Sequence, residues 1–167
     1  FVPEEQRALC WTDTMIHLDD GSRMLEPKMA ARMIQALDIK QSDKVLVVGA
    51  GSGYVAALCS GLATSVECVD MQQAALDRAS TNCALAGIRN VQFLKIQSVD
   101  DLPRAHYDAI FLRARRLSVP DEYLHRVNDS GRCVALVGGD HLMELICYTC
   151  HSGELIVDSI VDRKSTR

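Results

Sequence analysis

The stretch from Val45 to Tyr54 constrains the fold more than any other part of the chain. Four apolar residues in a row, Val45 to Val48, predict a strand buried on both faces, as in a parallel sheet. The glycines at positions 49, 51 and 53 let the backbone turn tightly and approach a ligand, because no Cβ is in the way. An apolar helical pattern follows. Strand, glycine loop and helix together predict a nucleotide-type cofactor site at the first crossover of an α/β sheet.

Two positions indicate which cofactor the loop binds. A dinucleotide-binding loop needs a small residue at position 54 for close helix–strand packing, and Tyr54 stands there instead. The next predicted strand ends in Asp70, about 20 residues after the loop, where an acidic side chain accepts hydrogen bonds from ribose hydroxyls. This combination favours S-adenosyl-L-methionine over NAD. The alternative is a tight strand–helix turn without a ligand.

Length and composition predict a single domain over residues 1–167, with residues 1–26 as an N-terminal cap on the substrate side. The net charge of -4 gives no reason to expect nucleic acid or an anionic membrane as a partner. No apolar run approaches the ~20 residues that span a bilayer, and no signal peptide is visible. We therefore expect a cytoplasmic monomer. The start at Phe1 suggests a piece of a longer protein.

The seven cysteines are an odd number, and four of them, Cys59, Cys68, Cys83 and Cys133, fall within apolar patterns. These four are predicted to be small buried hydrophobic residues in a reducing compartment. The segment 147–151, Cys-Tyr-Thr-Cys-His, matches the string for c-type haem attachment, but it lies in a predicted strand and we expect no haem. Without a second cysteine or histidine pair, we expect no metal site.

Hydrophobic periodicity predicts alternating strands and helices. The predicted helices cover 3–9, a segment opened by Pro27, 53–63, 72–86 and 120–127, with turns at 19–22 and 128–131; the predicted strands are 44–48, 65–70, 91–96, 107–112 and 132–137. Two further apolar runs, 142–150 and 154–161, are joined by a connection too short for a helix, so they must pair antiparallel. The expected fold is a Rossmann-like, doubly wound, mostly parallel seven-stranded sheet that ends in an antiparallel β-hairpin, which is typical of methyltransferases.

Several segments resemble the protein-L-isoaspartate O-methyltransferase family over most of the chain. They are Phe1-Val2-Pro3, Trp11-Thr12-Asp13, Glu26-Pro27 before a helix, Val45 to Tyr54, Tyr107 to Ile110, and Ser130-Gly131-Arg132. The resemblance implies a cytosolic enzyme that methylates the carboxylate of isoaspartyl residues in damaged proteins and leaves S-adenosyl-L-homocysteine as product. Methylation then permits succinimide formation and repair.

The resemblance also implies roles for individual residues. The cofactor-binding residues would be Gly49, Ala50, Gly51, Ser52, Gly53, Tyr54, Asp70, Met71 and Ser98; the substrate side would comprise Trp11, Asp13, Glu26 and Pro27. Two alternatives stay open: Trp11 only packs against the core, and Tyr54 only plugs the start of its helix.

Departures from the family pattern bear on the substrate. Leu25 stands where the family has a serine that contacts the substrate carboxylate, and leucine can neither donate nor accept a hydrogen bond. The segment Gln97-Ser98-Val99 replaces the Gly-Asp-Gly that follows the third strand in the family. Leu-Glu-Pro resembles a divergent bacterial branch. A second hypothesis is therefore a degenerate or re-purposed protein that binds S-adenosylmethionine but acts on another substrate or none; a small-molecule or RNA methyltransferase is a third.

Methyl transfer to a carboxylate needs no general base, because a carboxyl group with a pKa of roughly 4 is ionised at neutral pH. Three arginines, Arg113, Arg115 and Arg116, follow the fourth strand at the rim where substrate is expected. At least one is predicted to orient an anionic substrate through paired hydrogen bonds; the alternative is a solvated basic turn. The five histidines are scattered and are expected in loops or on the surface.

Overall fold

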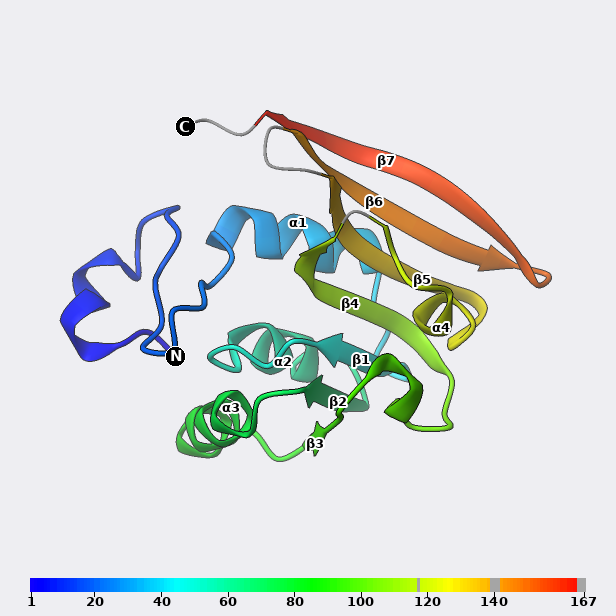
Figure 1. Ribbon diagram of the computed structural model, residues 1–167. Helices are drawn as coiled ribbons and strands as arrows, with labels where there is room; N and C mark the ends of the chain where they lie inside the picture. Colours follow the sequence, from blue (N-terminus) through cyan, green and yellow to red (C-terminus); the bar gives the residue numbers. More distant parts are fainter. Residues whose placement is uncertain (117, 139–141, 165–167) are drawn as a thin grey trace.

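The fold is built on a seven-stranded sheet in the order β3-β2-β1-β4-β5-β6-β7 (Figure 1). The computed structural model describes residues 1–116, 118–138 and 142–164, without the side chains of 114–116, 142 and 161–164. The strands are β1 (Lys44–Val48), β2 (Ser65–Asp70), β3 (Val91–Lys95), β4 (Tyr107–Arg116), β5 (Val127–Gly138), β6 (Leu142–His151) and β7 (Glu154–Lys164). The first five strands run parallel to one another, and β6 runs antiparallel to both β5 and β7. The predicted sheet and its C-terminal hairpin are confirmed.

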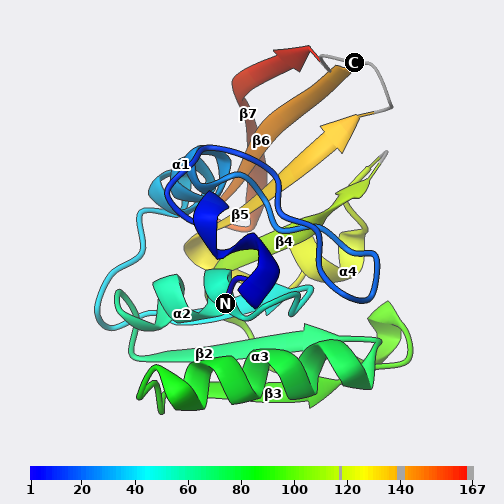
Figure 2. The same cartoon turned by 90° about the vertical axis from the view of Figure 1, so that its left-hand side faces the viewer.

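Helices cover both faces of this sheet (Figures 1 and 2). One face packs against α1 (Pro27–Leu37), α2 (Tyr54–Ser60) and α3 (Gln73–Leu85), and the other against α4 (Asp121–Leu124). Pro27 is the first residue of α1, where its missing N–H costs nothing. The buried side chains of α1 are Met29, Ala30, Met33, Ile34 and Leu37. The predicted N-terminal helix is a 3-10 helix, η1 (Glu4–Leu9).

The predicted turn at residues 128–131 is wrong, because these residues lie inside β5. Tyr107 of β4 pairs with Val127, but Ala109 pairs with Arg132, so β5 bulges outward between the two pairs without reversing direction. The Asn128 amide donates a 2.7 Å hydrogen bond to the side chain of Asp108, which holds the bulge against β4. The helix predicted over 120–127 is correspondingly shorter, as β5 begins at Val127.

The N-terminal segment, residues 1–26, crosses the edge of the sheet where β1, β2 and β3 end (Figures 1 and 2). Ile16, Leu18 and Met24 form a small buried cluster with which Val2 and Tyr54 are packed. The turn predicted at 19–22 is present: the Leu18 amide donates to the Ser22 carbonyl and the Gly21 amide donates to the Leu18 carbonyl. This cluster attaches the segment to the start of α2.

The cysteines are unpaired, and all except Cys10 are buried. Burial raises the pKa of the Cys59 thiol to about 12 and also raises the pKa values of Cys68 and Cys133. The prediction of buried, apolar cysteines at 59, 68, 83 and 133 is therefore confirmed. Cys147 and Cys150 lie within β6. Four histidines, His17, His106, His125 and His151, are exposed as predicted, and His141 lies outside the described residues.

Candidate functional site

The glycine loop between β1 and α2 is held in place by side chains of α3. Arg78 Nε donates to the Gly51 carbonyl at 3.0 Å, and Asn82 Nδ2 donates to the Ser52 carbonyl at 2.9 Å. Both side chains come from one side of α3, since residues four apart share a helix face. The loop itself requires glycine, because Gly49, Gly51 and Gly53 have φ values of 95°, 54° and 84°. The geometry of the glycine loop is thus set by α3, a helix that follows the loop in the sequence.

Asp70 lies at the end of β2, directly beside this loop. One carboxylate oxygen accepts a 2.7 Å hydrogen bond from the Ala50 amide, and the other accepts a 2.9 Å bond from the Gln72 amide. A carboxylate oxygen has two lone pairs, so each retains acceptor capacity after these bonds. The side chain is therefore oriented before any ligand arrives, and it retains the capacity to accept bonds from ribose hydroxyls.

A cavity of about 610 Å³ lies over this edge of the sheet, a volume in the range of small-molecule sites. Its walls come from three parts of the chain. The N-terminal segment contributes Met15, Arg23, Leu25 and Glu26; the strand ends and the residues after them contribute Val48, Gly49, Val69, Asp70, Met71, Gln72, Ile96, Arg113 and Leu136; α4 contributes Tyr123. Three of the predicted cofactor residues, Gly49, Asp70 and Met71, therefore line the same cavity as Leu25.

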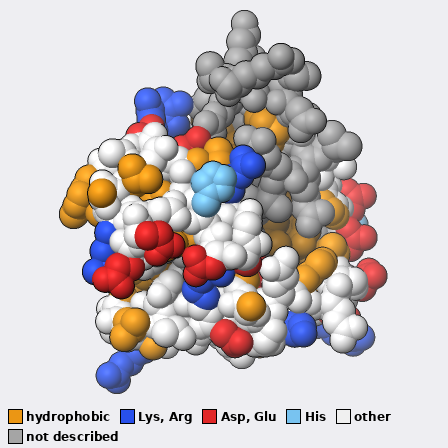
Figure 3. Space-filling view, turned by 60° about the vertical axis from the view of Figure 1, so that its left-hand side comes forward, with side chains coloured by type: hydrophobic (Ala, Val, Ile, Leu, Met, Phe, Trp, Pro, Cys, Tyr) orange, Lys and Arg blue, Asp and Glu red, His pale blue; other side chains and the backbone are white. Residues whose placement is uncertain are grey.

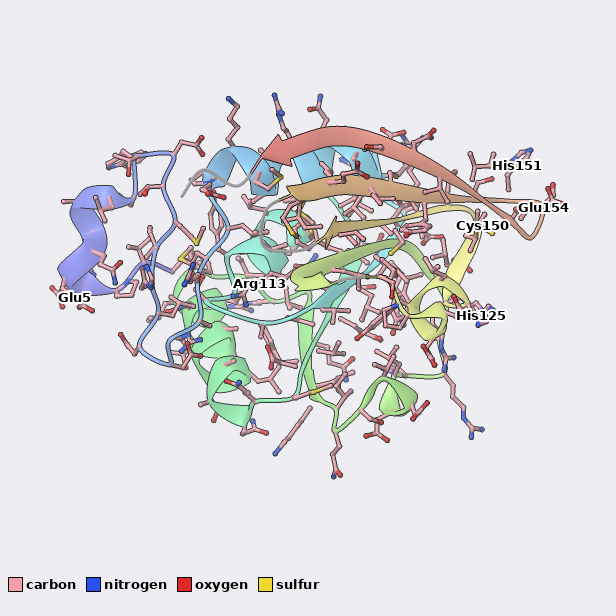
Figure 4. All side chains as sticks on the ribbon, turned by 45° about the horizontal axis from the view of Figure 1, so that its top comes forward. Glu5, Arg113, His125, Cys150, His151 and Glu154 are labelled. Atoms are coloured by element: carbon pink, nitrogen blue, oxygen red, sulfur yellow. The ribbon has the colours of Figure 1, made fainter. Side chains whose placement is uncertain are left out.

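Arg113 lies over the glycine loop and beside the N-terminal segment (Figure 4). The alignment of β1 with β4 places Leu112 beside Val48, so Arg113 follows level with Gly49. Burial lowers the pKa of this guanidinium, while the nearby carboxylates of Asp70 and Asp20 oppose that shift. A solvated basic turn does not describe this side chain. The role predicted for it, orienting an anionic substrate, stays a prediction, and the side chains of Arg115 and Arg116 lie outside the described residues.

Only some of the residues predicted on the substrate side lie at the cavity. Trp11 is 94 % exposed, so it is not packed against the core. Asp13 accepts a 2.9 Å hydrogen bond from the Lys28 amide and thereby caps the first turn of α1. Leu25 and Glu26 line the cavity, and Pro27 opens α1 next to them. The structure therefore brings Leu25 and Glu26 to the cavity, and it does not bring Trp11 or Asp13 there.

The remaining predicted cofactor residues also differ in position. Met71 lines the cavity with 49 % of its surface exposed. The Tyr54 ring makes an edge contact with Phe1 at 5.9 Å and packs with the N-terminal cluster. Ser98 caps the short helix η2 (Val99–Asp101) together with Asp101 and does not line the cavity. Ile96 contributes to the cavity wall where Ser98 was predicted.

Sequence patterns did not predict a role in the site for three residues: Arg78 and Asn82 of α3, and Asp20 of the N-terminal segment. Arg78 and Asn82 bind carbonyls of the glycine loop, and Arg78 also forms a 2.8 Å ion pair with Asp20. On a helical wheel both look like the polar border of an amphipathic helix. The available signal was their spacing of four, next to the apolar positions Ala79 and Cys83, which aims them along the buried side of the helix.

In the part of the chain that the structure describes, no group of three or more His, Cys, Asp or Glu side chains is placed to bind a metal. Nor does any described helix have the length and apolar character to cross a membrane. The face formed by the N-terminal segment carries acidic, basic and scattered apolar side chains side by side (Figure 3).

We expect acid to loosen the N-terminal segment through Asp20. Burial by itself would raise the pKa of Asp20, but hydrogen bonds from Ser22 and Arg78 hold that pKa far below its ordinary value. Since the folded-state pKa is lowered, the contribution of this carboxylate is fully present above the ordinary pKa of about 4 and is lost as the pH falls below it. Hydrogen exchange, corrected for intrinsic rates, should accelerate at the Leu18 and Met24 amides between pH 5 and pH 3.

The Gly49 amide, which donates to the Val69 carbonyl at 2.8 Å inside the sheet, serves as the internal reference. In Asp20→Asn the Leu18 and Met24 amides should already exchange faster at pH 5, with little further change on acidification. Equal pH profiles for wild type and Asp20→Asn would contradict this role.

This chain is similar to known proteins over most of its length. The model of the family described as protein-L-isoaspartate(D-aspartate) O-methyltransferase matches residues 1–162. A protein-L-isoaspartate O-methyltransferase of Roseiflexus sp. (strain RS-1) is 35% identical over 140 residues, which are 83% of this chain and 64% of that protein. The chain therefore spans less than two thirds of this relative.

Solved structures show the same fold. A protein-L-isoaspartate O-methyltransferase aligns with a TM-score of 0.77 at 20% identity, over 90% of this chain and 50% of that chain. A structure from Plasmodium falciparum described as a protein-L-isoaspartate O-methyltransferase, in complex with S-adenosyl-L-homocysteine, aligns with a TM-score of 0.73 at 21% identity. That alignment covers 92% of this chain and 78% of the Plasmodium chain.

Proposed function

Because the chain belongs to the protein-L-isoaspartate (D-aspartate) O-methyltransferase family, we propose that it methylates the carboxylate of isoaspartyl residues in damaged proteins. The proposed methyl donor is S-adenosyl-L-methionine, with S-adenosyl-L-homocysteine as the product. A solved neighbour of the same fold is described in complex with that product.

One observation carries the proposal: a single cavity joins the end of β2 and the glycine loop to the N-terminal segment. Asp70 and Gly49 line its cofactor side, and Leu25 and Glu26 line the side expected for substrate. Asp70 suits the ribose, because its carboxylate is already fixed by two backbone amides. Met71, Gln72 and Ile96 continue the wall beside it and would contact the base. Donor and acceptor would thus meet without any large rearrangement of the sheet.

The residues of the chain contribute positioning and not acid–base chemistry. S-adenosylmethionine supplies an activated methyl group when it is bound. The acceptor carboxylate is ionised at neutral pH and needs no base. Leu25 offers no hydrogen bond to that carboxylate, so the N-terminal segment would act by shape and by excluding water. Arg113 is a basic side chain that lines this cavity and also lies against the glycine loop.

The proposal is tested by transfer of labelled methyl from S-adenosylmethionine to an isoaspartyl peptide. We expect base-labile label on the isoaspartyl peptide and none on the matching aspartyl peptide. Leu25→Ser restores a hydroxyl on the substrate side and should raise kcat/KM by about two- to tenfold, since one hydrogen bond contributes roughly 0.5–1.5 kcal/mol. Asp77→Ser, on the exposed side of α3, is the matched surface control and should leave kcat/KM unchanged.

Transfer to neither peptide, in a protein that still gains thermal stability from S-adenosylhomocysteine, would reject the repair reaction. It would favour the second candidate, a protein of this fold that binds the cofactor but uses another acceptor or none. The observation behind that candidate is Leu25 itself, an apolar side chain lining the cavity on the substrate side.

Compartment and assembly belong to the same proposal. A cytoplasmic site of action is supported by the unpaired cysteines, because disulfides are rare where thiols are kept reduced. Residues 1–26 are proposed as the substrate-side cap of the domain, as Leu25 and Glu26 line the cavity. That the protein acts as a monomer stays a prediction.

A further inference from the structure

The side chain of Arg113 fills the space that the glycine loop leaves open. A Cβ on Gly51 would lie 2.2 Å from Arg113 Nη1 and 2.6 Å from its Cζ. A Cβ on Gly49 would lie 3.3 Å from Arg113 Cβ. Glycines in such a loop normally leave room for a ligand to approach the backbone. Here the surface freed at Gly49 and Gly51 is in contact with an arginine of the same chain.

Arg113 is held in this position from the opposite side as well. Its Nη2 donates a 2.7 Å hydrogen bond to the Arg23 carbonyl of the N-terminal segment. The carboxylates of Asp70 and Asp20 favour its positive charge, and Arg78 opposes it. The guanidinium therefore bridges the glycine loop and the N-terminal segment, and Figure 4 shows it between the two.

The two halves of the cavity consequently differ. The part of the cavity beside Asp70 is lined by Met71, Gln72 and Ile96. This half suits an adenine and a ribose. The half over the glycine loop, where the amino-acid part of S-adenosylmethionine would lie, meets the guanidinium first. A nucleoside would bind without moving Arg113. A nucleoside that carries an amino acid would bind only if Arg113 moved.

We propose that Arg113 is a latch that closes the amino-acid half of the cofactor site and is displaced when the complete cofactor binds. Displacement breaks the bond to the Arg23 carbonyl, so cofactor binding also loosens the N-terminal segment from the loop. The inference rests on the proposed function, because it concerns the same cofactor site. It adds a residue that sets which ligands the site prefers.

The latch makes a quantitative prediction about ligand preference. Breaking a hydrogen bond from a charged donor weakens binding by about tenfold to a hundredfold. In the wild type this loss offsets the contacts that the amino-acid part gains. Adenosine and S-adenosylhomocysteine should therefore bind with affinities within about threefold of each other. In Arg113→Ala the affinity for S-adenosylhomocysteine should rise by about tenfold or more, while that for adenosine changes by less than about threefold.

Isothermal titration of wild type, Arg113→Ala and a control tests this. Arg89→Ala is the control, because it removes the same charge from an exposed position after α3, and it should match the wild type for both ligands. Thermal unfolding without ligand establishes that each variant is folded. If Arg113→Ala does not fold, the comparison of the two ligands on the wild type still decides the question.

Several results would overturn the latch. One is a wild type that binds S-adenosylhomocysteine more than about tenfold tighter than adenosine. Another is weaker binding of S-adenosylhomocysteine by Arg113→Ala, which would make Arg113 an anchor for the ligand carboxylate. A third is that neither adenosine nor S-adenosylhomocysteine binds to the wild type or to Arg113→Ala. If the affinities are as expected but no methyl group is transferred, the latch is upheld and the repair function is rejected. If methyl transfer occurs but Arg113→Ala has the same ligand preference as the wild type, the repair function is upheld and the latch is rejected.

Discussion

Replacing Asp70 with alanine is expected to lower the affinity for S-adenosylhomocysteine by about a hundredfold or more. Hydrogen bonds to a charged group contribute roughly 1.5–3 kcal/mol each, and two ribose hydroxyls would lose their acceptor together. The effect is large because the carboxylate is fixed beforehand by the Ala50 and Gln72 amides, so a ligand does not have to order it. Isothermal titration of the purified variant measures the loss directly.

The control for this variant is Asp77→Ala. Asp77 is an exposed carboxylate on α3 that accepts a hydrogen bond from Gln73 on the same helix. The variant removes the same charge and should bind S-adenosylhomocysteine like the wild type. Asp70→Ala also leaves two backbone amides without their acceptor, so thermal unfolding without ligand must accompany the titration. An Asp70→Ala protein that is folded and binds within about threefold of wild type would exclude the ribose role.

Gly53→Ala should be the most destabilising single-methyl change in the loop. Gly53 has a φ of 84°, and a Cβ there would lie 2.8 Å from the Ala79 carbonyl oxygen and 3.0 Å from Ala79 Cα. The left-handed backbone costs a side chain about 1–2 kcal/mol, and overpacking against a backbone costs about 1–3 kcal/mol more. We expect the unfolding free energy to fall by roughly 2–5 kcal/mol, which lowers Tm by about 4–20 °C for a chain of this size.

Gly87→Ala separates the cost of the left-handed backbone from the cost of the steric contact with Ala79. Gly87 has a similar φ of 73°, but a Cβ there would meet no atom within 4 Å. Only the backbone term applies, so the loss should be about 1–2 kcal/mol. Thermal and urea unfolding of both variants gives the difference. Equal losses at the two positions would mean that the contact between the glycine loop and α3 is not tight.

The local parts of the site were predictable from the sequence because their signals are short. The apolar run of β1, the glycines after it and the acidic end of β2 lie within 26 residues, from Val45 to Asp70, and each follows from backbone or burial requirements of its own position. Pro27 predicted the start of α1 for the same reason. Asp70 and Gly49 accordingly line the cavity as expected.

The parts that escaped prediction depend on pairing between distant segments. Arg113 meets the glycine loop because β4 is the neighbour of β1 and Leu112 is level with Val48. Neither the strand order nor this register is visible in a sequence pattern. Asp13 caps α1 from 15 residues away, so its role also depends on the path of the N-terminal segment. The bulge in β5 was mistaken for a turn because Asn, Asp, Ser and Gly favour both.

The distribution of thiols has a practical consequence for studying this protein. Thiol reagents attack the thiolate, and burial keeps Cys59, Cys68 and Cys133 protonated at neutral pH. Cys10 is exposed and follows η1 directly. Because the other six cysteines are buried, a maleimide dye is expected to react first with Cys10, on the same segment that Arg113 and Arg78 bind. Fluorescence anisotropy of that dye would report when the segment leaves the sheet edge, without any engineered cysteine.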